Sequence, residues 1–503
     1  MFKNFQNNLL LRHPLLYNTR VVPMIAITLI INVLFFCVGY ADGAIDFTDT
    51  SQWSYDDTTF VVTVYAFFIA LLVFIVWLVY YFRHNAYKSF YPQSNYSLYK
   101  EWCVIALVCV LNCSYSASYL FAKDLRARSY FSEAEFSRRA DVLSMASLFI
   151  AGDLSDYSYY NKPFKPAYNT TQDSVLYNGK PYALSSLLNK PIKSYSYQNH
   201  EKDSLNERRI KNWLVANRKD SVLWVMKEFE KIAAEHGLKG NISTAKWMAL
   251  VYQYPEFNSP IAVDGIEKVI YEGYDDISTD TTEIAVAPSN IDKEQDTLSY
   301  RVQMVNGQKE LYSKYYVPGK QLHTSYGKIS EAWVSPDLNE ESALIYLYFG
   351  LMTSLAIFSF RVTSGKNWLI ALVGTGIMGI LTGIIGIVGS SFEVYGILWI
   401  FITLASILYF IAICYNGSGK SISGIVLNNV LWLTPWLIPL VYMTTTSIAR
   451  RNDQYDYMNY ESSFAKTLTD YSNIMMYGNL VLVVIYMYFL TVSIKKWKGI
   501  AEA

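Results

Sequence analysis

Residues 60–82 read FVVTVYAFFIALLVFIVWLVYYF, a run without one charged side chain. A helix of this length rises about 35 Å at 1.5 Å per residue, more than the roughly 30 Å hydrocarbon core of a bilayer. In water such a helix would expose apolar side chains on every face. The run therefore predicts a membrane-spanning helix.

Seven further runs of this kind lie along the chain. They leave the sequence 52% apolar and only 17% charged, against about 25% charged in an average soluble protein. The seventh of the eight predicted spans contains Pro435 and Pro439, so we expect a broken or kinked helix there. The eight spans are predicted at about 21–40, 60–82, 102–121, 343–360, 368–389, 394–414, 425–448 and 474–494.

Lysine and arginine in the short loops predict the orientation, because loops rich in these residues stay in the cytoplasm. With the N-terminus inside, twelve such residues fall inside and three outside. Both termini are then cytoplasmic, and we expect the first span to be retained, since it is longer than a cleaved signal. The inside residues are Lys3, Arg12, Arg20, Arg83, Lys88, Lys100, Arg361, Lys366, Lys420, Lys495, Lys496 and Lys498; the outside ones are Arg450, Arg451 and Lys466.

The polar stretch 122–342 predicts a folded extracytoplasmic domain, because about 220 residues can bury a core of their own. Two Ser–Glu pairs have the capping-box spacing that opens a helix. An apolar stripe at helical spacing follows, with a glycine as its stop. The pairs are Ser132 with Glu135 and Ser204 with Glu207; the stripe is Val222, Val225, Met226, Phe229 and Ile232, ended by Gly237.

A hairpin is predicted in the same domain, because residues 300–304 alternate and Asn306-Gly307 favours a turn before a return strand at about 310–317. The predicted fold is a polytopic α-helical membrane protein of about eight transmembrane helices, with an α+β extracytoplasmic domain inserted between helices 3 and 4. The predicted divisions are 1–20, an interfacial amphipathic N-terminal segment; 21–121, transmembrane helices 1–3; 122–342, the extracytoplasmic domain; 343–494, transmembrane helices 4–8; and 495–503, a cytoplasmic tail.

From the positions of the cysteines and histidines we expect no metal site, no cofactor and no disulfide framework. All five cysteines fall in apolar segments, and the five histidines are scattered singly. A formal net charge of zero gives no bulk attraction to nucleic acid. No charged residue lies deep inside a predicted span, which argues against a proton- or sodium-driven carrier. The cysteines are Cys37, Cys103, Cys109, Cys113 and Cys414; the histidines are His13, His84, His200, His236 and His323.

The fifth span is rich in glycine, and four of its glycines share one helix face. Gly379 and Gly383 have the GxxxG spacing that lets two helices approach closely. The pattern favours tight packing within one bundle; the alternative is a subunit interface or a face that slides during a transport cycle. The four residues are Gly376, Gly379, Gly383 and Gly386.

Polar residues inside two other spans have two interpretations each. Asn428 and Asn429, with Pro435 and Pro439, indicate either a functional break in the seventh span or hydrogen bonds between helices. The polar residues of the third span either line a wet crevice or, as we favour, bond to neighbouring backbone. These are Asn112, Ser114, Ser116 and Ser118.

Aromatic residues gather on the inside loop 83–101, where Tyr87, Phe90 and Tyr91 are candidate docking residues for a soluble partner. The alternative is an aromatic belt at the membrane interface. Before the first span, Phe2, Phe5 and Leu9 lie at helical spacing and predict a short interfacial helix.

An interfacial helix before span one and an aromatic loop between spans two and three resemble the layout of the membrane subunits of ABC-type transport systems. The resemblance covers at most the first 120 residues, and it rests on layout. It implies that the first feature is an elbow helix and the second a coupling helix. The chain departs from the usual six spans by having eight, and its outer domain follows span three.

We therefore expect the membrane subunit of a transport system that is energised by a separate cytoplasmic ATPase. The alternatives are a membrane-anchored extracytoplasmic sensor or scaffold and a membrane-anchored extracytoplasmic enzyme. Expected partners are the lipid bilayer, the ATPase subunit and further subunits of the same or another kind. The disulfide-free polar domain, rich in tyrosine, asparagine and lysine, favours the cytoplasmic membrane of a bacterium.

Overall fold

The computed structural model assigns the chain to two compact units, which we call the membrane unit and the polar unit. The membrane unit comprises Met1–Ala41, Asp57–Ala122 and Leu338–Ala503, and the polar unit comprises Asp42–Asp56 and Lys123–Asp337. The described residues are 11, 20–48, 57–83, 96–150, 174–177, 180–183, 200–253, 256–257, 263–264, 269–270, 300–305, 308–313, 316–388, 392–416, 420–454 and 463–498.

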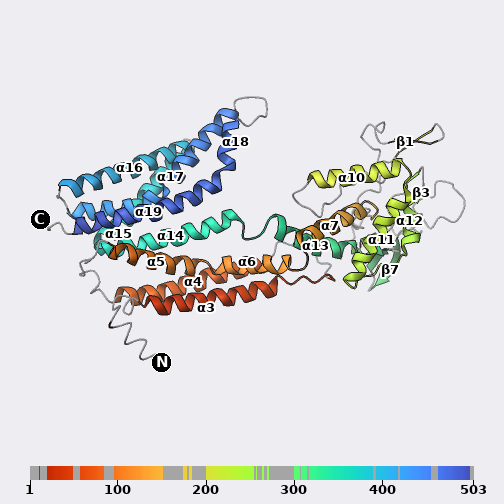
Figure 1. Ribbon diagram of the computed structural model, residues 1–503, viewed down its shortest axis with the longest axis horizontal. Helices are drawn as coiled ribbons and strands as arrows, with labels where there is room; N and C mark the ends of the chain where they lie inside the picture. Colours follow the sequence, from red (N-terminus) through yellow and green to blue (C-terminus); the bar gives the residue numbers. More distant parts are fainter. Residues whose placement is uncertain are drawn as a thin grey trace. The chain divides into compact units, whose positions relative to one another are not determined.

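Seven described helices are long and apolar enough to cross a membrane, and a bent pair of helices raises the number to eight if it forms one span. The chain is thus a multi-pass membrane protein (Figure 1). The seven are α3 (Val21–Asp42), α4 (Asp57–Arg83), α14 (Glu340–Val362), α15 (Gly365–Val388), α16 (Phe392–Asn416), α17 (Lys420–Gln454) and α19 (Ser472–Lys498); the pair is α5 (Ser97–Cys113) with α6 (Tyr115–Arg128), and the short α18 spans Ser463–Asp470.

The helix of the third span is broken, whereas the helix of the seventh span is continuous. α17 runs unbroken through Pro435 and Pro439, whereas α5 and α6 meet at a 53° angle beside Ser114. The predicted break in the seventh span is therefore wrong, and the alternative of a kink at the prolines stays a prediction. Prolines gave the stronger sequence signal for a break, but the chain interrupts the helix at a serine-rich stretch.

Close helix contacts in the membrane unit rest on single glycines. A Cβ atom at Gly350 of α14 would lie 2.9 Å from the Cα atom of Val110 on α5, so a larger residue does not fit. At Gly396 of α16 a Cβ would run into Thr444 of α17. Such glycines let backbones approach closely, which strengthens packing where hydrophobic association is weak.

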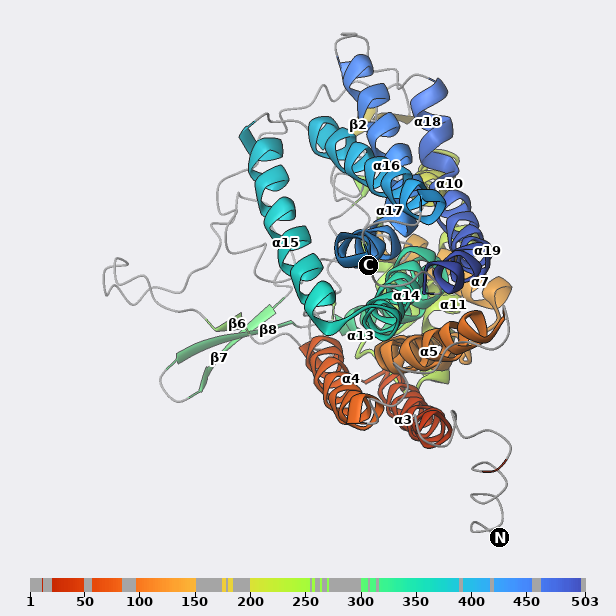
Figure 2. The same ribbon diagram turned by 90° about the vertical axis from the view of Figure 1, so that its left-hand side faces the viewer.

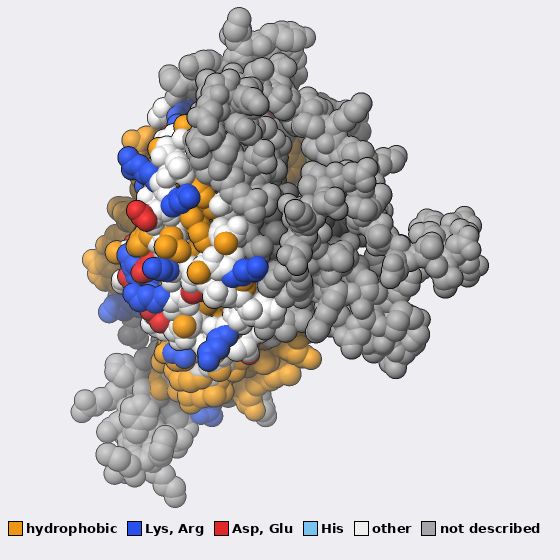
Figure 3. Space-filling model, turned by 90° about the vertical axis from the view of Figure 1, so that its right-hand side faces the viewer, with side chains coloured by type: hydrophobic (Ala, Val, Ile, Leu, Met, Phe, Trp, Pro, Cys, Tyr) orange, Lys and Arg blue, Asp and Glu red, His pale blue; other side chains and the backbone are white. Residues whose placement is uncertain are grey.

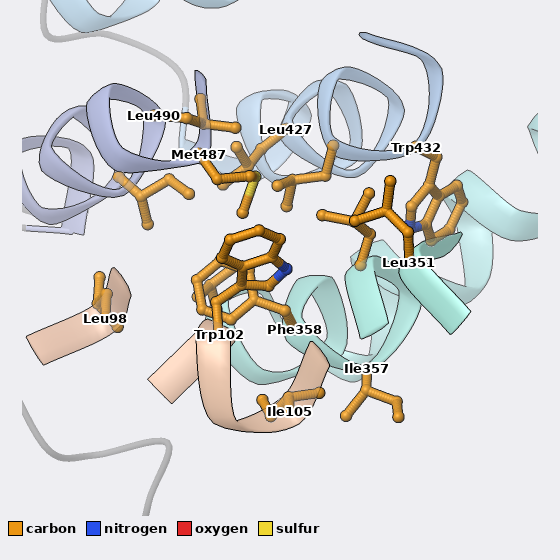
Figure 4. Packing of buried hydrophobic residues seen from close by; sticks show 14 of the residues in the cluster. Leu98, Trp102, Ile105, Leu351, Ile357, Phe358, Leu427, Trp432, Met487 and Leu490 are labelled. Carbon is orange, nitrogen blue, oxygen red and sulfur yellow. The ribbon is translucent and has the colours of Figure 1, made fainter. Parts of the chain in front are cut away.

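The apolar core of the membrane unit is drawn from helices far apart in the sequence. Trp102 of α5 and Phe358 of α14 lie against each other, facing Leu427 of α17 and Met487 of α19 (Figure 4). Viewed from the side in Figure 2, α14 lies near the centre of the unit and α15 at its margin.

The described part of the polar unit is built on five helices. Ser132 caps the first of them, accepting from the backbone N–H of Glu135 at 3.4 Å, as predicted. Ser204 lies inside a helix, so the second predicted capping box was wrong. The predicted stripe is buried, and Gly237 ends it at a positive φ of 73°. The helices are α7 (Glu133–Ser147), α10 (His200–Val215), α11 (Lys219–Glu235), α12 (Thr244–Val251) and α13 (Gly319–Val334).

The predicted hairpin is confirmed: β7 (Tyr300–Val305) pairs antiparallel with β8 (Gln308–Ser313) across residues 306–307. The other strands are short, and the sheets hold two or three strands each. The remaining strands are β1 (Ser174–Tyr177), β2 (Lys180–Ala183), β3 (Tyr252–Gln253), β4 (Glu256–Phe257), β5 (Val263–Asp264), β6 (Val269–Ile270) and β9 (Tyr316–Val317).

These strands do not build the core of the polar unit. Of its described buried apolar residues, only Tyr252 and Val317 come from strands. The predicted α+β class is therefore not supported, because the helices bury the apolar surface. On the described surface, lysine and arginine side chains lie spread among apolar ones (Figure 3).

Candidate functional site

A polar cluster joins three helices of the membrane unit. Proline has no N–H, so Pro439 leaves the carbonyl of Pro435, one turn earlier on α17, without its helical donor. The side-chain Nδ2 of Asn479 on α19 donates to this carbonyl at 2.9 Å. The same Nδ2 donates to the hydroxyl of Tyr348 on α14 at 2.7 Å. We call these four residues the proline–amide cluster.

The cluster is closed to its surroundings. Asn479 is 2% exposed, and the Tyr348 hydroxyl donates a hydrogen bond to the carbonyl of Met476 at 3.1 Å. The ring of Trp436 stacks on Tyr348 with 5.1 Å between centroids. One asparagine therefore satisfies the backbone group that the proline freed and links α14, α17 and α19 at one point.

Asn428 and Asn429 make hydrogen bonds between helices, the second of the two interpretations. Thr363, which caps the C-terminus of α14, donates to Asn428 Oδ1 at 3.2 Å. Thr375 of α15 donates to Asn429 Oδ1 at 3.1 Å. Both asparagines thus hold α17 to its neighbours, one turn or more from the prolines.

The bend between α5 and α6 has its own amide partner. Asn32 of α3 donates to the carbonyl of Leu111 at 2.9 Å and accepts from the hydroxyls of Ser114 and Ser118, at 3.0 and 2.6 Å. Asn112 donates to the carbonyl of Ala70 at 2.9 Å. The polar residues of the third span therefore bond largely to backbone and to Asn32, close to the interpretation that we favoured.

An ion pair is buried between α5 and α14. Arg361, 5% exposed, donates to the carboxylate of Glu101 at 2.9 Å, and the hydroxyl of Tyr81 on α4 donates to the same oxygen at 3.3 Å. Both charged residues come from segments predicted to flank the spans. Removing one partner of such a pair would leave a buried charge unpaired.

The glycine face of α15 is not closely packed. A Cβ at Gly376 or Gly383 would meet no atom within 4 Å, and at Gly379 it would touch only Trp399, at 3.8 Å. The prediction that this face packs tightly within the chain was therefore wrong. Gly386 also lies in α15. The docking candidates Tyr87, Phe90 and Tyr91 lie outside the described residues.

The polar unit contains a cluster of charged and aromatic side chains around Arg139. Its guanidinium donates to Glu135 and pairs with Glu235, both at 2.6 Å, and reaches the Tyr326 hydroxyl at 3.4 Å. Hydrogen bonds from Arg138 and Arg139 hold the pKa of the Glu135 carboxyl down at about 2. Burial raises the pKa of Tyr326 to about 12.

The segment that follows α3 is held on this cluster. Phe47 stacks on His236 with ring centroids 3.7 Å apart, and the N–H of Ile45 donates to the Tyr130 hydroxyl at 2.9 Å. Burial, with Arg139 nearby, lowers the pKa of His236, and its Nε2 lies 3.2 Å from the Tyr326 hydroxyl. The segment Asp42–Asp56, which follows α3, thus belongs to the polar unit.

Sequence reasoning found the prolines and missed their partners. Tyr348, Asn479 and Asn32 are single polar residues in long apolar runs, and no spacing pairs them with their targets. A proline identifies a freed carbonyl, that of the residue four positions before it. The signal available in the sequence was therefore an asparagine on another span that could donate to this carbonyl. Among the described residues, no group of three or more His, Cys, Asp or Glu could hold a metal ion.

Comparisons with known proteins add no relative. No family model, no curated protein and no solved structure matches the chain.

Proposed function

We propose that the protein is the membrane subunit of a transport system energised by a separate cytoplasmic ATPase. The observation that carries the proposal is the proline–amide cluster, in which Asn479 holds the Pro435 carbonyl and the Tyr348 hydroxyl together. A proline inside a continuous membrane helix is tolerated where a side chain of a neighbouring helix satisfies the carbonyl that it frees, and prolines recur in the helices at the moving parts of transporters.

The physical argument concerns the cost of bending α17. A helical hydrogen bond is absent at Pro435, so curvature there breaks no backbone bond. The replacement bonds are neutral side-chain bonds, each worth about 1 kcal/mol net. α17 can therefore change its angle to α14 and α19 at low cost, while Asn479 transmits the change to both. A bundle that only anchors a domain has no use for such a joint.

The remaining parts of the proposal come from the loop charges and the layout. In it the protein lies in the cytoplasmic membrane of a bacterium, both termini are cytoplasmic, and the polar unit is extracytoplasmic. The loop with Tyr87, Phe90 and Tyr91 docks the ATPase. Single cysteines at Ser51 and Ser94, in a cysteine-free background, test the orientation. An impermeant thiol reagent in intact cells should label the first and spare the second; the reverse labelling contradicts it.

The function is tested by isolating the intact protein from its native membranes in mild detergent. We expect a nucleotide-hydrolysing subunit to co-purify and to hydrolyse ATP. The Asn479→Leu variant should retain that subunit, but its ATP hydrolysis should differ from that of the natural protein. The reason is that the substitution alters the proline–amide cluster and leaves the docking loop unchanged. Isolation without any such subunit, in repeated mild conditions, contradicts the proposal.

A second function, a sensor whose polar unit binds an extracytoplasmic ligand, is favoured by one observation. The segment after α3 is fixed to the polar unit by the Phe47–His236 stack, so a change at His236 acts on a chain segment continuous with a membrane helix. Loss of response in a Phe47→Ala variant, with no ATPase co-purifying, would favour the sensor over the transporter.

A further inference from the structure

Residues 43–48, which we call the strap, follow directly on the last residue of α3 and are held on the polar unit by a ring stack and by hydrogen bonds. The ring of Phe47 lies parallel to the ring of His236, with 3.7 Å between centroids. Histidine ordinarily titrates near pH 6.5, so the main ring contact of the strap rests on a titratable side chain. The hydrogen bonds run from the Ile45 N–H to the Tyr130 hydroxyl, at 2.9 Å, and from the Ser325 hydroxyl to the Asp46 carbonyl, at 3.4 Å.

The edge of the His236 ring meets a hydroxyl whose hydrogen-bond pattern is fixed. Arg139 Nη1 donates to the Tyr326 hydroxyl oxygen at 3.4 Å, and a guanidinium group never accepts. The tyrosine proton must therefore point to another acceptor, and His236 Nε2 lies 3.2 Å from the same oxygen. A ring nitrogen that accepts belongs to a neutral imidazole, with its proton on Nδ1. The docked strap thus stacks on a neutral His236.

Protonation of His236 reverses this hydrogen bond. The Nε2 of an imidazolium carries a proton that points at the Tyr326 oxygen, so the tyrosine proton loses its acceptor. Tyr326 is fully buried, and a buried proton left without an acceptor is unfavourable. The His236 ring is only half-buried, so it can turn toward water, where an imidazolium is well solvated. Phe47 loses its stacking partner when the ring turns away.

Charges around His236 act in both directions. Burial and Arg139 lower the pKa of His236, whereas Glu235 raises it. His236 also caps the C-terminus of α11, and both the carbonyl end of a helix and the face of Phe47 attract a cation. The net shift of the pKa is downward, so the neutral ring fits the docked arrangement better than the protonated ring. The titratable and charged groups around the ring are Glu135 and Arg139 of α7, Glu235 of α11, Tyr326 of α13, Tyr130 with Arg126 at the end of α6, and Asp46 of the strap.

We propose that His236 is a pH-sensitive latch for the strap: the neutral side chain holds Phe47 on the polar unit, and protonation releases it. Because the strap follows directly on α3, a proton bound by the polar unit loosens the chain segment at the end of a membrane helix. The latch does not rest on the transport function, so either one can fail in an experiment without the other.

The test is hydrogen–deuterium exchange of the intact protein in detergent, with protection factors corrected for the intrinsic exchange rate at each pH. The Ile45 amide reports docking directly, because its N–H is bonded to Tyr130. From pH 7 to pH 5 the protection factor of the strap should fall, by at most about tenfold per pH unit for a single proton. Peptides of α11 should remain at least about tenfold better protected than the strap at pH 5, since one released contact does not unfold the helices.

Three variants separate the latch from other effects of acid. His236→Phe keeps a ring for Phe47 and cannot be protonated, so protection of the strap should be the same at pH 7 and pH 5. Tyr326→Phe keeps the histidine but removes the hydroxyl that opposes its protonation, so the dependence on pH should become smaller. His200→Gln, at the first residue of α10, removes a different histidine of the polar unit and should leave the dependence unchanged.

Two results overturn the proposal. The first is an undiminished loss of strap protection in His236→Phe, which would assign the effect of acid to other groups. The second is equal protection of the strap and α11 at pH 5, which would mean that the strap opens only when the whole unit unfolds. If His236→Phe does not fold, Tyr326→Phe decides, because the natural dependence on pH in that variant also contradicts the latch.

Discussion

Asn479 donates to the carbonyl of Pro435 at 2.9 Å, and Pro435 is the residue whose helical donor Pro439 removes. A side chain from α19 thus takes the place of a backbone N–H inside α17. The same amide reaches Tyr348 of α14. Three helices separated by up to 131 positions in the sequence meet at one carboxamide, and the properties of this joint can be measured directly.

The first prediction concerns Asn479 itself. Asn479→Leu keeps the branching of the side chain at Cγ but leaves the Pro435 carbonyl and the Tyr348 hydroxyl without their partner, at a cost of about 2 kcal/mol. The midpoint of thermal unfolding in detergent should fall clearly. Asn473→Leu is the matched control, because Asn473, on the same helix, makes an exposed bond to Glu340. Equal midpoints for the two variants would show that the cluster holds nothing together.

The second prediction couples Asn479 to Pro439. Pro439→Ala supplies an N–H for the Pro435 carbonyl, so the carbonyl no longer depends on the asparagine. Asn479→Leu should then cost less in the Pro439→Ala background than in the natural sequence, by about 1 kcal/mol. The measurement is a double-mutant cycle on unfolding midpoints. Strict additivity of the two changes contradicts the coupling.

The effect of a glycine substitution on folding should depend on the contacts of that glycine and not on its place in a sequence pattern. Gly350→Leu forces α14 away from the backbone of Val110, so the folded yield after detergent extraction should drop severely. A Cβ at Gly374 would meet no atom within 4 Å, so Gly374→Leu should fold normally. Size-exclusion profiles of the two variants provide the measurement. A well-folded Gly350→Leu protein would mean that the two helices do not approach this closely.

The polar unit should lose stability as the pH falls below neutrality. An unfolded histidine binds its proton with a pKa near 6.5, whereas burial and Arg139 lower the pKa of His236 in the folded unit. The unfolded state therefore binds more protons between these two values, and acid favours it. Amide protection factors in α11 of the intact protein, which are corrected for the intrinsic exchange rate at each pH, should fall from pH 7 to pH 5. His236→Phe should flatten that trend; an unchanged trend in the variant assigns it to other groups.

Much of the fold follows from runs and periods in the sequence. Long uncharged runs predict the spans, and the stripe from Val222 to Ile232 predicts the buried face of α11, because burial is set by local periodicity. The hairpin follows from Asn306-Gly307. The fold class of the polar unit could not be predicted from the sequence. Local signals predict that strands form, but they do not show how little of the buried core the strands supply.

The candidate site was predictable only on one of its three helices. The spacing of Pro435 and Pro439 predicts a freed carbonyl. Which residue donates a hydrogen bond to it depends on the tertiary arrangement of α14 and α19. The glycines were misleading for the same reason. The glycines of α15 have the regular spacing of a packing face but no closely packed neighbour, whereas Gly350 packs closely against α5 and is part of no such spacing. Pairing between spans is a property of the packed bundle.

The central claim, a membrane subunit driven by a separate ATPase, is tested most directly by what the intact protein carries out of its native membranes. The protein and its Phe90→Ala/Tyr91→Ala variant are isolated in mild detergent, and the co-purifying proteins are assayed for ATP hydrolysis. Aromatic side chains central to an interface commonly contribute 2 kcal/mol or more, so the double change should weaken docking at least about thirtyfold. We predict an ATP-hydrolysing subunit with the natural protein and its loss from the variant, whose helices stay inserted. Isolation of the natural protein without any such subunit would contradict the account.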